Sequence, residues 1–194
     1  MSDPETDALD RADMARLCSG YDTALNDLME RHAAPVFHFL CRMLGSEDDA
    51  NDLAQETFVR VFRSRDSFRA DAKFSTWLFT IAANLARSQL RWRGHRPNVS
   101  LDAESETTGQ SLGESLPSDA QTPEGEMTVR ERAAAVRHAV AQLPDDMREA
   151  IVLCELEDKA VAEAAAILET TPKAVESRLY RARQLLRQRL AKWL

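Results

Sequence analysis

Long apolar runs are absent from this sequence of 194 residues, and no stretch approaches the roughly 18 residues that a membrane span needs. The acidic N-terminal stretch has no apolar core of a signal peptide. Cysteines are few, and the odd, widely spaced set Cys18, Cys41 and Cys154 fits no disulfide framework. We therefore expect a cytoplasmic protein with reduced thiols and no insertion into a membrane.

Signatures of catalysis are also missing, because the sequence has no phosphate-binding loop, nucleophile elbow or catalytic triad. Asp48, Asp52 and Glu56 would share one helix face, but no histidine or glycine-rich loop accompanies them, so a solvated or partner-binding face is favoured over a metal site. His38 and Cys41 supply two ligands where zinc prefers about four. We predict no enzyme, no metal and no cofactor.

Strand-like alternation and internal repeats are absent too, whereas helical periods run through most of the chain. The predicted fold is all-α, with two small helical domains joined by a flexible acidic linker. The predicted divisions are an acidic, loose N-terminal tail at residues 1–20, with or without a short helix at its end, a first domain at 21–96, the linker at 97–128 and a second domain at 129–194.

Local signals predict the helix ends of the first domain. Pro35 interrupts a helical period, so it starts a second helix or kinks the first. Gly45 is a stop signal, and Ser46 with Asp49 predicts the N-cap of the next helix. A long helix is expected from about Phe74 to Arg93.

The second domain is predicted to open with an inward stripe of apolar residues. That stripe consists of Val129, Ala133, Val136, Val140 and Leu143. A short alanine-rich helix follows at residues 161–168. Thr171 is then expected to cap the last helix, with Pro172 at its first position.

Acidic and basic residues are segregated along the chain, so individual segments contain few residues of the opposite charge. The net charge of −7 by itself argues superficially against a polyanionic partner. Residues 1–30 carry eight acids and two bases, and residues 98–128 carry seven acids and no base. Residues 173–194 carry seven bases and one acid. This segregation leaves basic patches that suit nucleic acid.

Aromatic residues make up only 6% of the chain, yet five of them lie between Phe68 and Arg96. The same stretch contains Arg87, Arg91 and Arg93 near its end. Rings that stack on bases, interleaved with cations that hold phosphates, are typical of single-stranded nucleic-acid binding. The alternative is an amphipathic core helix with a solvated basic end.

A short helix, a tight turn and a longer basic helix near the C-terminus predict a helix-turn-helix, whose second helix enters the major groove of DNA. The alternative is a helical bundle with a solvated basic helix.

Together these segments resemble the extracytoplasmic-function sigma factors of bacterial RNA polymerase. The resemblance lies in DANDLAQETFVRVFR (49–63), FRADAKFSTWLFTIAANLARSQLRWR (68–93), LPDDMREAIVLCELED (143–158) and AVESRLYRARQLLR (174–187). The first segment is similar to the family's region 2.2, and the second is similar to regions 2.3 and 2.4. The last two segments are both similar to region 4. The resemblance implies promoter recognition in stress responses and regulation by an anti-sigma factor.

The resemblance also implies three sets of site residues. Core polymerase would be bound by Asp52, Gln55, Glu56 and Phe58. The melted −10 element would be read by Arg69, Lys73, Trp77, Asn84, Arg87 and Arg91. The duplex −35 element would be bound by Thr171, Lys173, Ser177, Arg178 and Arg181.

The sequence departs from the family pattern in the helix-turn-helix. Asp158–Val161 stands where a Gly-Leu-Ser-Tyr-like stretch is usual, Glu169 replaces a turn glycine, and Glu176 replaces a base. If residue 169 needs a positive φ, Glu costs about 1 kcal/mol relative to Gly. These departures leave a rival interpretation: a sigma-like decoy that binds an anti-sigma factor without serving promoters. A helix-turn-helix repressor is a second rival, but it leaves the first domain unexplained.

Overall fold

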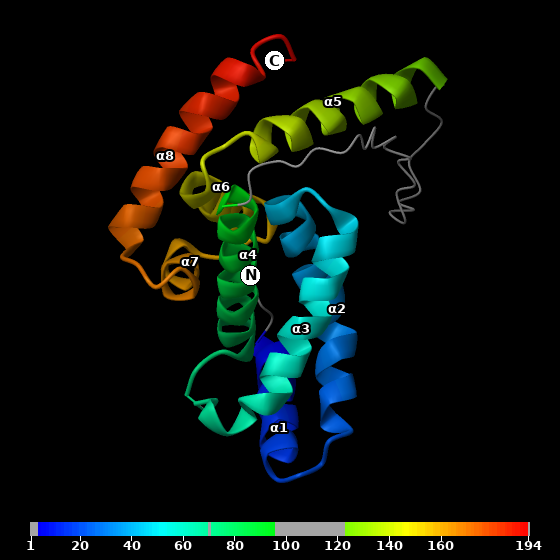
Figure 1. Ribbon diagram of the computed structural model, residues 1–194, viewed down its shortest axis with the longest axis vertical. Coiled ribbons are helices and arrows are strands. Elements are labelled where there is room, and N and C mark those ends of the chain that lie inside the picture. The colour runs from blue at the N-terminus through cyan, green and yellow to red at the C-terminus, as the bar shows by residue number, and fades with distance from the viewer. Residues whose placement is uncertain (1–3, 70, 96–122, 194) are drawn as a thin grey trace.

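The computed structural model describes residues 4–69, 71–95 and 123–193, and it leaves the side chains of His95 and residues 123–129 undescribed. The described residues form helices joined by short turns and loops and include no strand, which confirms the all-α prediction (Figure 1). The elements are α1 (Pro4–Cys18), α2 (Ala24–Leu44), α3 (Glu47–Arg63), η1 (Arg65–Ser67), α4 (Phe74–His95), α5 (Pro123–Ala141), α6 (Asp145–Ile151), the π-helical turn η2 (Val152–Leu156), α7 (Val161–Ile167) and α8 (Pro172–Arg189). No helix in these ranges is long and apolar enough to cross a bilayer.

The first unit, α1 to α4, is built around apolar faces that meet inside it. Phe39 of α2 and Phe79 of α4 pack edge to face, with ring centroids 5.4 Å apart. Pro35 lies inside a single continuous α2 instead of starting a new helix. Gly45 ends α2 at a φ of 66°. The Ser46 hydroxyl accepts the Asp49 N–H at 3.3 Å, so the predicted stop and cap are confirmed.

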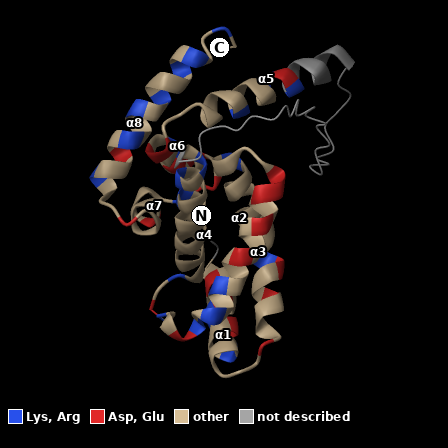
Figure 2. Ribbon diagram, viewed as in Figure 1, with Lys and Arg blue, Asp and Glu red and all other residues tan. Residues whose placement is uncertain are grey.

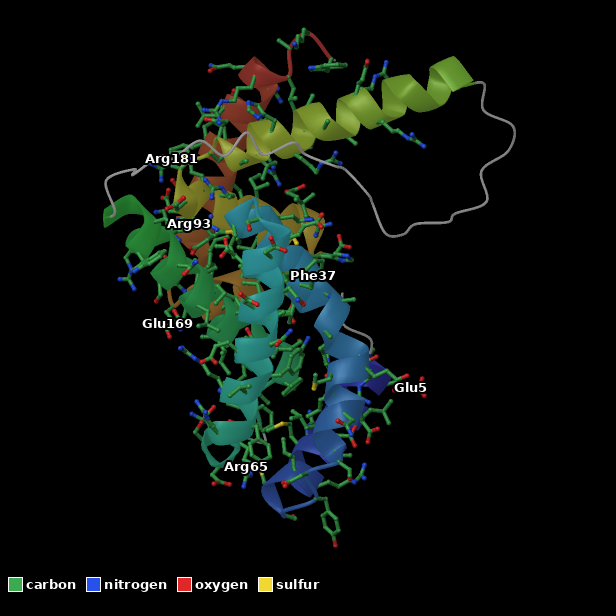
Figure 3. All side chains as sticks on the ribbon, turned by 45° about the vertical axis from the view of Figure 1, so that its right-hand side comes forward. Glu5, Phe37, Arg65, Arg93, Glu169 and Arg181 are labelled. Atoms are coloured by element: carbon green, nitrogen blue, oxygen red, sulfur yellow. The ribbon has the colours of Figure 1, made fainter. Side chains whose placement is uncertain are left out.

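The far end of α4 is tied back to the α2–α3 turn. Arg93 donates to the Leu44 carbonyl at 2.9 Å and pairs with Asp49, beside the beginning of α3 (Figure 3). Gln89 also donates to Asp49, at 3.4 Å. These contacts set the angle between α3 and α4, the two helices that carry the candidate sites of this unit.

Residues 4–18 form a packed helix, so the prediction of a loose N-terminal tail is wrong for them. Met14 and Leu17 of α1 are buried in the core. Asp10 and Asp13 are buried as well, and Arg31 of α2 donates to them at 2.9 Å and 2.6 Å. The sequence predicted a loose tail there because the basic partner of these acids lies some twenty residues away.

The second unit, α5 to α8, begins earlier than predicted, because α5 starts at Pro123. The predicted inward stripe is only partly correct. Val140 and Leu143 are buried, but Ala133 is exposed and Val136 is 41% exposed. The described side chains of α5 before Ala139 are largely exposed, and an apolar groove of about 820 Å³ lies between α5 and the end of α8. The predicted linker at residues 97–122 lies outside the described residues.

The two units pack against each other, with α4 between α3 and α7 (Figure 1). Arg148 of α6 donates to the Met43 carbonyl at 2.8 Å, and Arg42 of α2 donates to the Leu156 carbonyl at 3.2 Å. The Lys159 ammonium lies 4.6 Å from the centroid of the Phe79 ring. One apolar core therefore continues from the first unit into the second.

Candidate polymerase and nucleic-acid interfaces

An aromatic cluster fixes the loop that precedes α4. The ring centroids of Phe68 and Trp77 are 5.3 Å apart, and Phe74 lies 6.1 Å and 6.2 Å from them. Phe74 is buried, and the other two are half-buried. His32, which contacts Asp10 at 2.7 Å, lies 5.2 Å from the Phe74 ring. Trp77 therefore anchors the loop at the beginning of α4.

Two cations border this loop. The Arg69 side chain is 78% exposed and forms a two-pronged contact with Asp71, with Nη2 to Oδ2 at 2.8 Å. That hydrogen bond lowers the pKa of Asp71. Lys73 pairs with Glu163 at 2.8 Å and with Asp7 at 3.5 Å, and the hydrogen bond from Lys73 to Glu163 raises the pKa of Lys73. Arg69 faces solvent, whereas Lys73 faces the second unit.

Asn84 lines a small pocket between α3 and α4, away from the second unit. The pocket has a volume of about 290 Å³. Its lining is formed by Arg60, Arg63, Ser64, Ile81 and Asn84. Arg60 is held by Glu56, with Nε to Oε1 at 2.9 Å, while Arg63 is exposed. An exposed amide beside two guanidinium groups offers donors and an acceptor to a base, and positive charge to its phosphate.

Arg87, nearly one turn along α4 from Asn84, reaches toward α6. Its Nε atom lies 3.1 Å from Glu149 Oε1. The orientation is poor, however, and both Arg87 Nη2 and Glu149 Oε1 are buried without a hydrogen bond. Burial raises the pKa of Glu149 to about 7, and attraction to Arg87 and Arg178 offsets only part of that rise. Arg87 thus contacts the second unit, whereas Asn84, three residues earlier on the same helix, lines the pocket beside α3.

Arg91, the last predicted −10 residue, is exposed near the end of α4. Its Nη2 atom donates to the Ser88 hydroxyl at 3.4 Å. The six predicted −10 residues therefore share one helix and its preceding loop, but they do not converge on one point.

Acidic residues gather along α3, as Figure 2 shows. Asp52 and Gln55 are exposed on this helix, and Glu56 is half-buried because it pairs with Arg60. Phe58 is only 3% exposed, so it packs behind the face instead of lying on it. Val59 is 40% exposed beside these polar residues, and sequence reasoning missed it. Among the described residues no cluster of His, Cys, Asp and Glu could hold a metal.

The second unit carries its cations along α8 (Figure 2). The Thr171 hydroxyl accepts the Ala174 N–H at 3.2 Å, which confirms the predicted cap. Glu169 has a φ of 52° in the turn, so this position does require a left-handed backbone. The geometry agrees with a helix-turn-helix, in which the first turns of α8 present their exposed side chains to DNA.

The predicted −35 residues do not all face outward. Lys173, Ser177 and Arg181 are exposed, but Arg178 is half-buried and its Nε atom lies 3.6 Å from Asp146. Tyr180 is 66% exposed, three residues after Ser177 and next to Arg181. The sequence analysis did not include Tyr180 among the residues on the exposed face of α8. Its position three residues after Ser177, on the same side of a helix, is the signal that could have placed it there.

Comparison with known proteins matches both units. The Sigma-70 region 2 family matches residues 28–96, and the Sigma-70, region 4 family matches residues 133–186. The "ECF RNA polymerase sigma-E factor" of Haemophilus influenzae is 35% identical over 185 residues, which cover 93% of this chain and 95% of the relative.

Two solved structures extend the likeness to three dimensions. CnrH in complex with the cytosolic domain of CnrY has a TM-score of 0.70 and 28% identity, and the match covers 95% of this chain and 98% of that one. The sigma factor RpoE of Bartonella quintana, in complex with the anti-sigma factor NepR, has a TM-score of 0.64 and 26% identity, with 87% and 98% covered. The chain belongs to the extracytoplasmic-function sigma factors of bacterial RNA polymerase.

Proposed function

We propose a division of labour between the two units of this sigma factor. The chain binds core RNA polymerase, directs it to specific promoters and is regulated by an anti-sigma factor. The observation that carries this function is the presence of both sigma-70 regions, in order, on one chain. The protein acts as an initiation factor alongside polymerase in the cytoplasm, and its role is not that of an enzyme. The separate tasks of polymerase binding, −10 recognition and −35 recognition belong to particular side chains of α3, α4 and α8.

The outer face of α3 is the proposed surface for core polymerase. Exposed Asp52 and Gln55, with Val59 beside them, combine hydrogen-bonding groups and apolar area on a rigid helix. Phe58 supports this face from behind, and Glu56 fixes Arg60. Such a mixture suits a protein interface, in which a few well-packed contacts supply most of the binding energy.

The pocket at Asn84 is the proposed site for an unstacked base of the −10 element. Unstacking costs a few kcal/mol per base, and a pocket that stacks and hydrogen-bonds the extruded base offsets that cost. Asn84 would read the base edge, and exposed Arg63 would hold the neighbouring phosphate. Arg69, Lys73, Arg87 and Arg91 would bind phosphates on either side. Trp77 would act indirectly, by holding the loop.

The first turns of α8 are the proposed contact with the duplex −35 element. Lys173 and Arg181 are exposed and suit phosphates, while Ser177 can reach a base edge. Thr171 acts chiefly as the helix cap, because its hydroxyl already accepts a backbone N–H. Arg178 would contact DNA only after leaving Asp146.

A pull-down with core RNA polymerase tests the proposed α3 surface. Asp52→Arg reverses one charge on this face and Gln55→Ala removes one amide. Together they should weaken retention of the protein by core at least about tenfold, because a few residues carry most of the binding energy of an interface. Arg181→Ala on α8 is the control and should leave retention nearly unchanged. Equal retention of the α3 variant and the control would show that core binds elsewhere.

A further inference from the structure

Helix α1 borders the loop between α3 and α4 that carries Arg69 and Lys73, called the −10 loop below (Figure 1). Near the C-terminal end of α1, the Cys18 thiol donates to the Arg65 carbonyl at 3.4 Å, where this loop begins. Near its N-terminal end, an Asp7 carboxylate oxygen lies 3.5 Å from the Lys73 ammonium, where the loop ends. One helix therefore contacts the −10 loop at both of its ends.

Between these two contacts, His32 of α2 connects α1 to the aromatic cluster. The His32 Nε2 atom lies 2.7 Å from Asp10 Oδ2, and the ring centroid of His32 lies 5.2 Å from that of Phe74. Asp10, His32 and Phe74 are 1%, 7% and 3% exposed, so water competes little for these contacts. Buried polar groups that satisfy each other in this way hold their side chains in one orientation.

The contact with Asp10 is what allows a histidine to lie at this buried position. A buried imidazole is costly unless its nitrogens are hydrogen-bonded, and Asp10 is the partner of Nε2. Arg31, next to His32 in the chain, holds the other Asp10 oxygen at 2.9 Å. The position of α1 therefore determines the position of the ring that packs on Phe74.

Phe74 passes this order on to the −10 loop. It is the first residue of α4, and its ring centroid lies 6.1 Å from that of Phe68 and 6.2 Å from that of Trp77. Within the loop, the Ala72 N–H donates to the Arg69 carbonyl at 2.9 Å. A continuous series of contacts thus leads from α1 to the backbone of the exposed cation.

We propose that His32 is a positioning residue for −10 recognition: Asp10 of α1 holds its ring, and the ring holds Phe74 and the −10 loop. The inference rests on the proposed −10 role of this loop. It gives a part in promoter opening to α1, which precedes the residues that match the Sigma-70 region 2 family. His32 and Asp10 act through the loop and not on DNA, because both are buried.

His32→Gln in the full chain tests this role. The glutamine amide can still donate to Asp10, so α1 stays docked, but the ring that packs on Phe74 is removed. Hydrogen exchange followed by mass spectrometry should show several-fold faster exchange at the amides of Phe68 and Ala72, which are hydrogen-bonded within the loop. Exchange in α2 and α8 should stay as in the wild type, whereas a generally destabilised fold would exchange faster there as well.

The same variant separates recognition from recruitment. Core polymerase should retain His32→Gln as well as it retains the wild type, since the outer face of α3 is unchanged. With core saturated by the chain, the yield of chain-dependent transcripts from genomic fragments of the source bacterium should fall several-fold. His38→Gln makes the same substitution at an exposed position of α2 and is the matched control. It should leave loop exchange and transcript yield unchanged.

Asp10→Asn tests the contribution of α1 from the other side of the contact. The substitution keeps the size of the side chain but replaces one carboxylate oxygen by an amide nitrogen, so one of the contacts to Arg31 and His32 loses its acceptor. The same loop amides should exchange faster, to a smaller extent than in His32→Gln. Loop exchange at the wild-type rate in Asp10→Asn would overturn the part given to α1.

The outcomes separate the inference from the proposed function. Loop amides of His32→Gln that exchange no faster than those of His38→Gln overturn the positioning role, whatever the transcript yield. Faster loop exchange with an unchanged transcript yield overturns the −10 assignment of Arg69 and Lys73, and the positioning role with it. Faster loop exchange and fewer transcripts, at equal retention by core, support the inference.

Discussion

At the scale of single residues, Glu149 is a carboxylic acid held where its charge is costly. Its pKa rises from the ordinary value of 4.5 to about 7, because burial outweighs the attraction of Arg87. The pKa is higher in the folded than in the unfolded chain. The contribution of this group to stability is therefore fully present below about pH 4.5 and is lost as pH rises through about 7.

Glu149→Gln should remove this pH dependence, because the amide cannot ionise. A shift of this size corresponds to about 3 kcal/mol at most between the two ends of the titration. The difference in free energy of unfolding between the variant and the wild type should therefore move in favour of the variant from about pH 5 to about pH 8. Urea denaturation at both pH values measures it. Parallel pH profiles for the two proteins would show that Glu149 is already ionised in the fold.

Residues whose role is local could be predicted from sequence, and residues whose role depends on docking could not. Ser46 and Thr171 cap helices through atoms three residues away, so their sequence context was sufficient. Asp10 lies on the acidic N-terminal stretch, and nothing nearby indicates that Arg31 will bury it. That Arg87 contacts Glu149 of α6 while Asn84 lines a pocket with residues of α3 depends on how the helices dock.

At the scale of elements, the turn between α7 and α8 retains a strained position. Glu169 has a φ of 52°, a conformation that costs a residue with a side chain more than it costs glycine. The sequence indicated this strain, because glycine is usual at that place in the family. The turn still forms, since Thr171 caps α8 directly after it.

Glu169→Gly should stabilise the protein by about 1 kcal/mol, through relief of that backbone strain. Urea denaturation followed by circular dichroism measures the change. Ala162→Gly, at an exposed position of neighbouring α7, is the control with the opposite sign. It should destabilise by less than about 1 kcal/mol, because glycine is a poorer helix former than alanine but Ala162 lies in the first turn of α7. A destabilised Glu169→Gly variant would mean that interactions of the Glu169 side chain stabilise the fold by more than the backbone strain at this position destabilises it.

The elements that sequence misjudged are those whose partner lies elsewhere in the chain. Pro35 removes one backbone hydrogen bond, yet α2 continues through it because Val36, Phe39 and Leu40 are buried on the same face. The apolar stripe of α5 predicted burial along its length, but only its last turns contact the core. Periodicity indicates which face can be buried, and packing decides how much of it is.

At the scale of the whole molecule, segregated charge explains how an acidic protein carries two surfaces for DNA. The net charge is −7, but the bases follow α8 and the loop and end of α4 (Figure 2). Sequence indicated these two basic regions and the two units. It could not indicate that acids of α6 and α7 meet the cations of α4, because such pairing depends on how the units dock.

Reconstituted transcription tests the central claim most directly. Purified chain and core polymerase should be combined with pooled genomic fragments from the source bacterium, and the 5′ ends of the transcripts should be sequenced. The account predicts transcripts that depend on the chain and share one pair of upstream −10 and −35 sequences, with Asn84→Ala reducing them while the variant still binds core. Core binding without any chain-dependent transcript would contradict the account and would favour a decoy for an anti-sigma factor.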